Sequence, residues 1–397
     1  MAPLVLTHFT AVNALGRGNA AVFAALAAGR SGLRPCTFEQ VKLDTHVGEV
    51  AGLDDMTVTE RLAEFDCRNN RLAQLTLEQD GFAARVAAAR EKYGACRIAV
   101  ILGTSTSGIL ETEHAYQHRD PQSGKLPAGF RFATTHNLYA STDFVRRYLG
   151  LEGPAAMIST ACSSSAKVFA AASRLIALGL CDAAVVGGVD SLCRNTLYGF
   201  ASLDLVGSEP CRPCDAQRGG ISIGEAAGFA LLEKPEAARD HSGIALLGYG
   251  ESSDAYHMST PHPEGEGAAL AMRRALASAS LDPAAIDYIN MHGTASQVND
   301  SMEDKAITSV FGTNTPASST KGWTGHALGA AGITEAIISA LCLQNGFLPG
   351  CLNAHRIDPS FTSRILMSSE HRPLRRVLSN SFGFGGSNAS LIFGGHP

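Results

Sequence analysis

AAMISTACSSSAKVFAAASRLIALGLCDAAVVGGVD, residues 155–190, is the stretch that decides the fold. It begins with a short apolar run, passes through Cys162 in a cluster of small residues, and then changes period. Apolar side chains next recur at the spacing of one helix face, up to Gly179: Val168, Phe169, Ala172, Leu175 and Ile176. A second apolar run, residues 183–189, follows directly. The stretch therefore predicts strand, sharp turn, helix and strand, the pattern of an α/β protein.

Cys162 lies at the turn that opens the predicted helix. Unpaired amide groups and the positive end of a helix macrodipole stabilise a thiolate at such a position, so the pKa of this thiol is expected to fall. A single free cysteine is more often a small buried apolar residue. The loops of the second half of the chain favour a nucleophile over that interpretation.

The composition describes a globular protein with a large core, because 397 residues exceed one ordinary core and 45% of them are hydrophobic. The net charge is −5 and the basic residues are scattered, which argues against a nucleic-acid or membrane-surface partner. The N-terminal segment lacks the pattern of a secretory signal, and no apolar run approaches membrane-spanning length. We therefore expect a cytoplasmic protein whose ten cysteines are reduced thiols.

One cysteine pair, Cys211 and Cys214 in the sequence CRPC, has the spacing of metal ligands. A four-cysteine zinc site needs a second such pair, and the sequence contains none. A thioredoxin-type motif should open a helix after a strand, whereas this segment has the composition of a loop. We therefore predict no metal site.

The chain has the organisation of two similar halves. Residues 234–243 are polar and rich in turn residues, so we place a boundary there, between a first half of residues 1–240 and a second half of residues 241–397. The C-terminal strand, glycine loop and strand resemble the layout of residues 219–232. This similarity suggests an internal duplication, with helices stacked between sheets.

Loops of the second half supply further reactive side chains. A predicted buried strand runs straight into His292, and Lys321 and His326 lie in a glycine-containing loop before another helix. Asp300, with Glu303 three residues later, predicts a capping box at the start of a helix. Sites in α/β folds gather at the ends of strands, and a nucleophilic cysteine with histidines elsewhere in the sequence is a catalytic arrangement.

Five motifs together resemble an elongating β-ketoacyl-acyl carrier protein synthase of the thiolase superfamily. They are TACSSSA at Cys162, RPCDAQRGG with GEAAG, HGTAS at His292, STKGWTGHALGAAG with Lys321 and His326, and NSFGFGGSN near the end. They follow the order of the family over residues 155–394. The resemblance implies a thiolase-like fold, with two duplicated halves in αβαβα layers. It also implies decarboxylative condensation of malonyl-acyl carrier protein with a cysteine-bound acyl chain, in fatty-acid, polyene or polyketide-type biosynthesis.

The resemblance also implies roles for the reactive residues. Cys162 would take up the acyl chain, because a thiolate is a good nucleophile toward a thioester. His292 and His326, as neutral imidazoles, would donate hydrogen bonds to the enolate oxygen formed from the malonyl donor. Lys321 would support the site through a link to Glu303.

Further residues are implied around the substrate. The backbone amides of Cys162 and Phe384 would form an oxyanion hole, and Phe384 and Phe200 are candidates for a gate that admits the acyl chain, since glycines beside Phe384 permit backbone movement. Thr294 and Ser296 would bind the phosphopantetheine arm. The alternative interpretation is that both phenylalanines are core residues and that Thr294 and Ser296 cap the following turn.

The implied partner is acyl carrier protein, whose phosphopantetheine arm carries the substrates, and no other cofactor is expected. The protein would form a homodimer, or a heterodimer with a chain-length-factor-like subunit. Cys214 stands where relatives usually have phenylalanine, and Ile221 closes a Gly-Gly-Ile where relatives have Asp-Gly-Phe, so the acyl pocket is expected to differ. The TACSSS sequence is closer to polyketide-type ketosynthases, which favours a specialised pathway such as polyene assembly.

Three alternatives remain at this point. A chain-length factor resembles the enzyme but lacks the nucleophile, so Cys162 argues against it. A thiolase or an initiating synthase would use coenzyme A thioesters, and the pair His292 and His326 favours the elongating class. A cysteine hydrolase would release free acid without a malonyl donor, which an apolar acyl tunnel that excludes water would prevent.

Overall fold

The computed structural model describes residues 1–237 and 243–395. Most strands belong to one continuous sheet that consists of two halves joined where β1 meets β10, with Leu4 opposite Leu246. From the centre outward, the first half contains β1 (Leu4–Asn13), β9 (Ala226–Glu233), β7 (Ala183–Asp190), β5 (Ile98–Gly103) and β6 (Ala155–Ile158). The second half contains β10 (Ile244–Ser253), β17 (Ser387–Gly395), β16 (Arg376–Gly383), β11 (Tyr288–Asn290), β12 (Pro316–Ser318) and β14 (Arg364–Ile365).

The strand order reveals the duplication. With β14 set aside, each half places its first, fifth, fourth, second and third strand in sequence from the centre outward. The directions also agree, because β9 and β17 are antiparallel to both of their neighbours, whereas the three outer strands of each half run parallel. The prediction of two duplicated halves is therefore confirmed.

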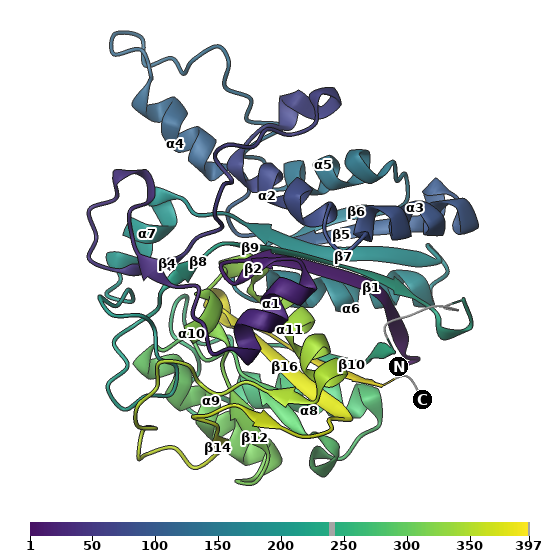
Figure 1. The fold of residues 1–397 in the computed structure, drawn as a ribbon, viewed down its shortest axis with the longest axis vertical. Coiled ribbons are helices and arrows are strands. Elements are labelled where there is room, and N and C mark those ends of the chain that lie inside the picture. Colours follow the sequence, from purple (N-terminus) through teal and green to yellow (C-terminus); the bar gives the residue numbers. More distant parts are fainter. Residues whose placement is uncertain (238–242, 396–397) are drawn as a thin grey trace.

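Helices complete five layers, which Figure 1 shows from the side. Helices α6 (Ser164–Ala177) and α11 (Ala331–Asn345) lie between the two sheet halves and share one hydrophobic core with both. The outer face of the first half is covered by α2 (Arg68–Leu77), α3 (Phe82–Tyr93) and α5 (Tyr139–Leu149). The outer face of the second half is covered by α8 (Glu266–Ala279) and α9 (Gln297–Phe311). The predicted αβαβα arrangement is thus confirmed.

The burial of these elements follows from their sequences. Every residue of β7 is buried, as expected of an uninterrupted apolar run covered by helices on both faces. Of the described residues, Leu328–Asn345 form one helical stretch that is long and apolar enough to cross a membrane. Because 89% of that stretch is buried inside the protein, it is the central core helix rather than a candidate span.

Smaller elements surround the layers. They are α1 (Asn19–Ala27), α4 (Ile109–Gln117), α7 (Arg194–Ala201), the short α10 (Lys321–Thr324), β2 (Gly16–Arg17), β3 (Arg34–Pro35), β4 (His46–Gly48), β8 (Ile223–Gly224), β13 (Phe347–Leu348) and β15 (Glu370–His371). The proposed boundary within residues 234–243 falls largely on residues 238–242, which lie outside the described residues, so the division at residue 240 stays a prediction.

The start of α9 differs from the predicted capping box. Ser296 is the cap, and its hydroxyl oxygen accepts a hydrogen bond from the Asn299 amide at 3.3 Å. Asp300 and Glu303 are fully buried and accept hydrogen bonds from other segments. The capping-box prediction was wrong because the serine four residues before Asp300 begins the helix first.

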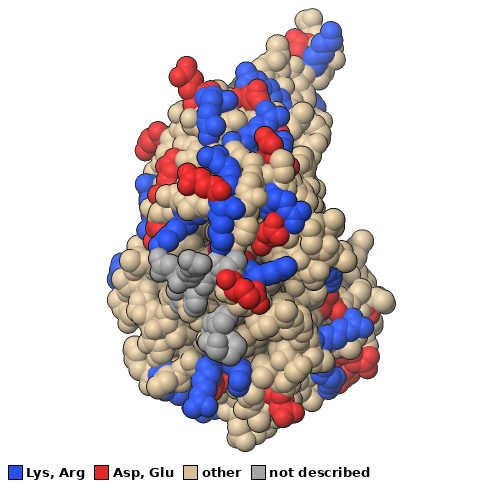
Figure 2. All heavy atoms as spheres, turned by 90° about the vertical axis from the view of Figure 1, so that its right-hand side faces the viewer, with Lys and Arg blue, Asp and Glu red and all other residues tan. Residues whose placement is uncertain are grey.

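The surface charges are mixed. On the face seen in Figure 2, basic and acidic side chains are interspersed rather than gathered into one basic patch.

Candidate active site

Cys162 lies in a sharp turn between β6 and α6. Ala161, just before it, has a φ of 51°, which is uncommon for a residue with a side chain. Small polar side chains hold this turn: the Ser164 hydroxyl accepts from the Thr160 amide at 2.9 Å, and the Ser163 hydroxyl donates to the Thr160 carbonyl at 2.9 Å. The cluster of small residues in the sequence is therefore the framework of the nucleophile turn.

The pKa of Cys162 departs from the prediction. The helix begins two residues later, at Ser164, and Cys162 is only 6% exposed. Burial raises the pKa of this thiol to about 12, against which the nearby charge of Lys321 acts only in part. The expectation of a lowered pKa was wrong because loss of hydration outweighs the charge of Lys321 and the backbone hydrogen bond that lower the pKa, so the resting sulfur is a neutral thiol.

His326 is brought to the sulfur by the second half of the chain. Its Nε2 lies 3.0 Å from the Cys162 Sγ. Its backbone pairs with the strand segment at β8, since its amide donates to the Ser222 carbonyl at 2.7 Å and its carbonyl accepts from the Gly224 amide at 3.0 Å. A Cβ on Gly224 would lie 2.4 Å from the Thr324 carbonyl oxygen, so glycine permits this close approach.

His292 follows β11 and faces the same point. One nitrogen or sulfur atom from each of Cys162, His292 and His326 lies within 4.8 Å of the others, and all three side chains are buried. The two imidazole rings meet edge to face at 5.3 Å between centroids. Burial, followed by the charge of Lys321, lowers the pKa of both histidines well below the ordinary value, so both rings are neutral near pH 7.

Lys321 fixes the protonation of His292. Its ammonium group donates to the His292 carbonyl and to Glu335, and lies 3.3 Å from the Nδ1 of His292. Because an ammonium group has donors only, the Nδ1 accepts and the proton of the neutral ring resides on Nε2. The Nδ1 of His326 has no partner among the described residues, so the contact of its Nε2 with the Cys162 thiol is the one hydrogen bond of this ring among those residues.

The predicted link between Lys321 and Glu303 was wrong. Lys321 forms its ion pair with Glu335, a buried residue of α11 that the sequence analysis missed. Glu303 instead accepts from the amides of His292 and Gly293, each at 2.8 Å, and so holds the loop that carries the imidazole. A lone glutamate in the apolar sequence GITEAIISAL was the available signal, because a buried charge requires a partner.

A cavity of about 420 Å³ leads to Cys162, His292 and His326 and is lined by all four residues predicted for substrate binding. Phe200 and Phe384 both line it and pack against each other, with 5.7 Å between ring centroids. Phe384 stands in the turn between β16 and β17, where Gly385 has a φ of 79°. The two gate candidates are therefore neighbours at the cavity wall.

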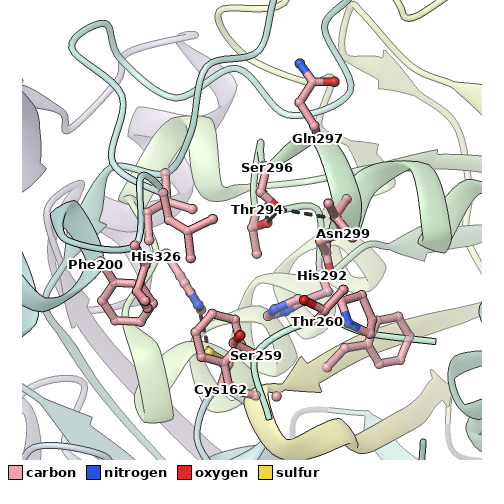
Figure 3. A pocket seen from close by; sticks show the side chains of 18 of the residues that line it. Cys162, Phe200, Ser259, Thr260, His292, Thr294, Ser296, Gln297, Asn299 and His326 are labelled. Carbon is pink, nitrogen blue, oxygen red and sulfur yellow. Dashed lines mark hydrogen bonds between the residues drawn. The ribbon is translucent and has the colours of Figure 1, made fainter. Parts of the chain in front are cut away.

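Thr294 and Ser296 line the same cavity, where their hydroxyl groups lie 3.0 Å apart. Figure 3 shows them above Cys162, toward which the His326 ring points. Ser296 also caps α9, so the alternative capping role applies to this residue as well.

Cys214 and Ile221, the two positions that depart from the residues usual in relatives, lie in different places. Ile221 is buried, lines the cavity and packs near Phe200. Cys214 is buried away from the cavity, against Met291 and other residues beneath α8 and α9. Of the two, only Ile221 contacts the space in which an acyl chain or its arm would lie.

The fold and the site define a class of protein. A buried thiol lies beside two neutral imidazoles at the junction of two duplicated α/β halves. This arrangement is typical of a thiol-dependent acyltransferase.

Comparison with known proteins agrees with this class. Residues 2–238 match the family described as beta-ketoacyl synthase, N-terminal domain, and residues 244–355 match its C-terminal domain. The chain is 39% identical over 311 residues to 3-oxoacyl-[acyl-carrier-protein] synthase 2 of Rhizobium meliloti, covering 74% of this chain and 73% of the relative. It is 32% identical over 419 residues to the same-named protein of Vibrio cholerae, covering 98% of each.

A solved structure is similar over the whole chain. In the solved structure of the ketosynthase ApeO in complex with its chain length factor ApeC, from Xenorhabdus doucetiae, the matching chain is 39% identical with a TM-score of 0.89, covering 100% of this chain and 98% of that one. The chain belongs to the beta-ketoacyl synthase family. It is a 3-oxoacyl-acyl carrier protein synthase, which carries out the condensation step of fatty-acid or polyketide synthesis.

Proposed function

We propose that Cys162 is the acyl-accepting nucleophile of this synthase and that His292 and His326 act on both the acyl and the malonyl thioester. The contact of 3.0 Å between the Cys162 Sγ and the His326 Nε2, with His292 beside it, carries the proposal.

In the first step the Cys162 sulfur attacks the carbonyl carbon of the acyl thioester on the carrier. Because the pKa of the resting thiol is about 12, its proton moves to the neutral His326 during the attack. The amides of Cys162 and Phe384 stabilise the oxyanion. The bond from carbonyl to carrier sulfur then breaks, the carrier thiol takes the proton from His326, and the acyl chain remains on Cys162.

In the second step malonyl-acyl carrier protein loses carbon dioxide and leaves an enolate. His292 donates from Nε2 to the enolate oxygen, because Lys321 occupies the side of its Nδ1. His326 donates as well when its proton is on Nε2, which its unpartnered Nδ1 permits. Neutral donors suit this step, since they stabilise the developing charge without protonating the carbon nucleophile.

In the third step the carbanion attacks the acyl carbon on Cys162. The carbon–sulfur bond of the acyl-enzyme breaks, the β-ketoacyl product leaves on the carrier, and the thiolate takes a proton from solvent. Phe384, packed on Phe200 at the cavity wall, gates the acyl chain, and Thr294 and Ser296 bind the phosphopantetheine arm. Glu303 and Glu335 position His292 and Lys321 respectively.

The assembly we propose is a dimer, either of two copies or with a chain-length-factor-like subunit, in the cytoplasm. Strand β6 ends the sheet with one neighbour in the described chain, so its other edge is available for pairing. Tyr116, Phe132 and Tyr139 are also between 40% and 56% exposed. The structure of the Xenorhabdus ketosynthase with a chain length factor supports a heterodimer. A native mass measured with and without such a subunit distinguishes the two assemblies.

The intact mass of the protein after incubation with acyl-acyl carrier protein tests the nucleophile. We expect one added acyl group on the wild type and on Cys96→Ala, whose cysteine is exposed, and none on Cys162→Ala. An unchanged adduct on Cys162→Ala would refute the proposal. Release of free acid without malonyl donor would indicate a cysteine hydrolase, and equal turnover of acetyl coenzyme A would indicate the thiolase class.

A further inference from the structure

Cys162, His292 and His326 have the donor atoms and the spacing of metal ligands. One nitrogen or sulfur atom of each lies within 4.8 Å of the other two, and all three side chains are buried. The prediction of no metal site concerned Cys211 and Cys214, neither of which belongs to this group. The three reactive side chains are therefore a separate candidate for metal binding.

The spacing fits a tetrahedral zinc site. Zinc–sulfur bonds of about 2.3 Å and zinc–nitrogen bonds of about 2.0 Å place a sulfur and a nitrogen ligand about 3.5 Å apart, and two nitrogen ligands about 3.3 Å apart. The Sγ of Cys162 and the Nε2 of His326 are 3.0 Å apart, and no pair in the group exceeds 4.8 Å. Movements of about 1 Å at the ligand atoms therefore bring all three to one ion.

Proton release keeps the net charge of this buried site unchanged. A bound divalent ion replaces the thiol proton of Cys162 and the Nε2 proton of His292. The ammonium group of Lys321, 3.3 Å from the Nδ1 of His292, passes one proton to Nδ1 and stays hydrogen-bonded to that ring, to the His292 carbonyl and to Glu335. Because two protons leave as the ion enters, binding adds no buried charge.

The donor atoms select the class of metal. A thiolate and two imidazoles suit Zn²⁺ and Co²⁺, whereas Mg²⁺ and Ca²⁺ prefer oxygen ligands. His326 binds through Nε2 when its proton resides on Nδ1, which has no partner among the described residues. The cavity of about 420 Å³ meets all three side chains, so it supplies both an entry path and room for water as the fourth ligand.

We propose that the free-thiol form of the enzyme binds one zinc-class divalent cation through Cys162, His292 and His326, and that this ion reversibly blocks acylation. The binding rests on the geometry alone. The inhibition rests on the proposed function, because the ion occupies the sulfur that attacks the acyl thioester. An acyl chain on Cys162 removes the thiolate ligand, so zinc and the acyl donor compete for the same atom.

Competition with a coloured zinc chelator tests the binding on metal-free protein in a buffer without free thiols. We expect the wild type and the control Cys96→Ala, which lacks an exposed cysteine, to bind one Zn²⁺ each. Cys162→Ser and His326→Ala should each bind about a hundredfold more weakly or worse, since loss of a residue outside the ligand set already costs about 10- to 100-fold in metal sites. Equal affinity of Cys162→Ser and the wild type would overturn the proposal.

Cobalt identifies the ligand atoms without any measurement of activity. Co²⁺ bound to a thiolate has a charge-transfer absorption in the near ultraviolet, which we expect for the wild type and for Cys96→Ala. Cys162→Ser should lack this absorption while its thermal unfolding shows a folded protein. An unchanged cobalt spectrum of Cys162→Ser would place the ion elsewhere and refute the assignment.

Acylation separates this inference from the proposed function. After treatment with an acyl thioester of N-acetylcysteamine and removal of the donor, bound zinc should fall in proportion to the acylated fraction seen by intact mass. Zn²⁺ at about ten times its Kd should slow acylation of the wild type about tenfold, and EDTA should restore the rate. Full zinc binding by fully acylated protein would overturn the inference. Absence of an acyl adduct on Cys162 would overturn the proposed function, and the zinc titration would still decide the metal site.

Discussion

The two halves of the molecule have the same strand order but use corresponding loops differently. In each half the loop after the third strand leads into a helix between the sheets, α6 in the first half and α11 in the second. The first of these loops carries Cys162, and the second carries Lys321 and His326. Because the halves face each other across these helices, the nucleophile of one meets the imidazole of the other.

The loops after the second strand differ more. In the first half, after β5, the hydroxyl groups of Thr104 and Thr106 donate hydrogen bonds to the buried carboxylate of Asp190. The oxygen–oxygen distances are 2.5 Å for Thr104 and 2.7 Å for Thr106. In the second half, after β11, the loop turns the His292 side chain toward the cavity and is itself held by Glu303. The duplication thus supplies two equivalent loops: the loop after β5 has a structural role, and the loop after β11 carries a reactive side chain.

The largest test of this contrast is removal of the imidazoles. We expect His292→Ala or His326→Ala to lower kcat/KM for condensation about 10³-fold, because each removes a donor or proton acceptor at the reacting atoms. Steady-state rates with malonyl- and acyl-acyl carrier protein measure the loss, and thermal unfolding shows whether the fold persists. A loss below tenfold in a folded variant would contradict the assignment.

The buried ion pair of Lys321 and Glu335 lies entirely within the second half. Glu335→Ala would leave the ammonium group buried without its carboxylate, so we expect the free energy of unfolding to fall by about 3 kcal/mol. The double variant Lys321→Met, Glu335→Leu should recover most of that stability while condensation stays impaired, because His292 loses its partner at Nδ1. Urea unfolding of the wild type, the single variant and the double variant measures these free energies. Equal stability of the single and double variants would contradict the cost assigned to the unpaired ammonium group.

The reactivity of the first-half nucleophile depends on pH. With a thiol pKa raised to about 12, the thiolate fraction of Cys162 grows about tenfold per pH unit throughout the range from 7 to 10. Alkylation by iodoacetamide, followed at Cys162 by peptide mass spectrometry, should therefore rise about a hundredfold from pH 7 to pH 9. Glutathione, with an ordinary thiol pKa, is the control and should level off near pH 9. A plateau in the alkylation rate of Cys162 below pH 8 would contradict the raised pKa and support the lowered pKa that the sequence predicted.

Periodicity was sufficient to predict the elements that form the layers. The apolar positions of residues 155–190 predicted β6, α6 and β7 correctly, because the buried face of α6 repeats with the helical period and β7 is a fully buried apolar run. The motifs also identified Cys162, His292 and His326, which the structure brings together.

Quantities that depend on three-dimensional distance were not predictable from the same sequence. Glu303 and Glu335 are both plausible partners of Lys321 by residue type, and only the packing of α11 against the loop brings Glu335 into contact. The prediction of a lowered pKa for the Cys162 thiol was wrong for a related reason. A helix end is visible in a sequence, whereas the depth of burial that opposes it is set by both halves together.

The smallest expected effect concerns the loop after β5, which is the first-half counterpart of the His292 loop. Thr104→Val removes a hydroxyl that donates to Asp190 and to the Val189 carbonyl at 2.8 Å, so we expect the free energy of unfolding to fall by about 1–2 kcal/mol. The kcat of the folded variant should stay within about threefold of the wild type, because Thr104 does not line the cavity. Urea unfolding and steady-state rates on one preparation measure both. A loss of kcat like that of His292→Ala, without a loss of stability, would mean that the first-half loop takes part in the chemistry and that the halves are less specialised than their contacts indicate.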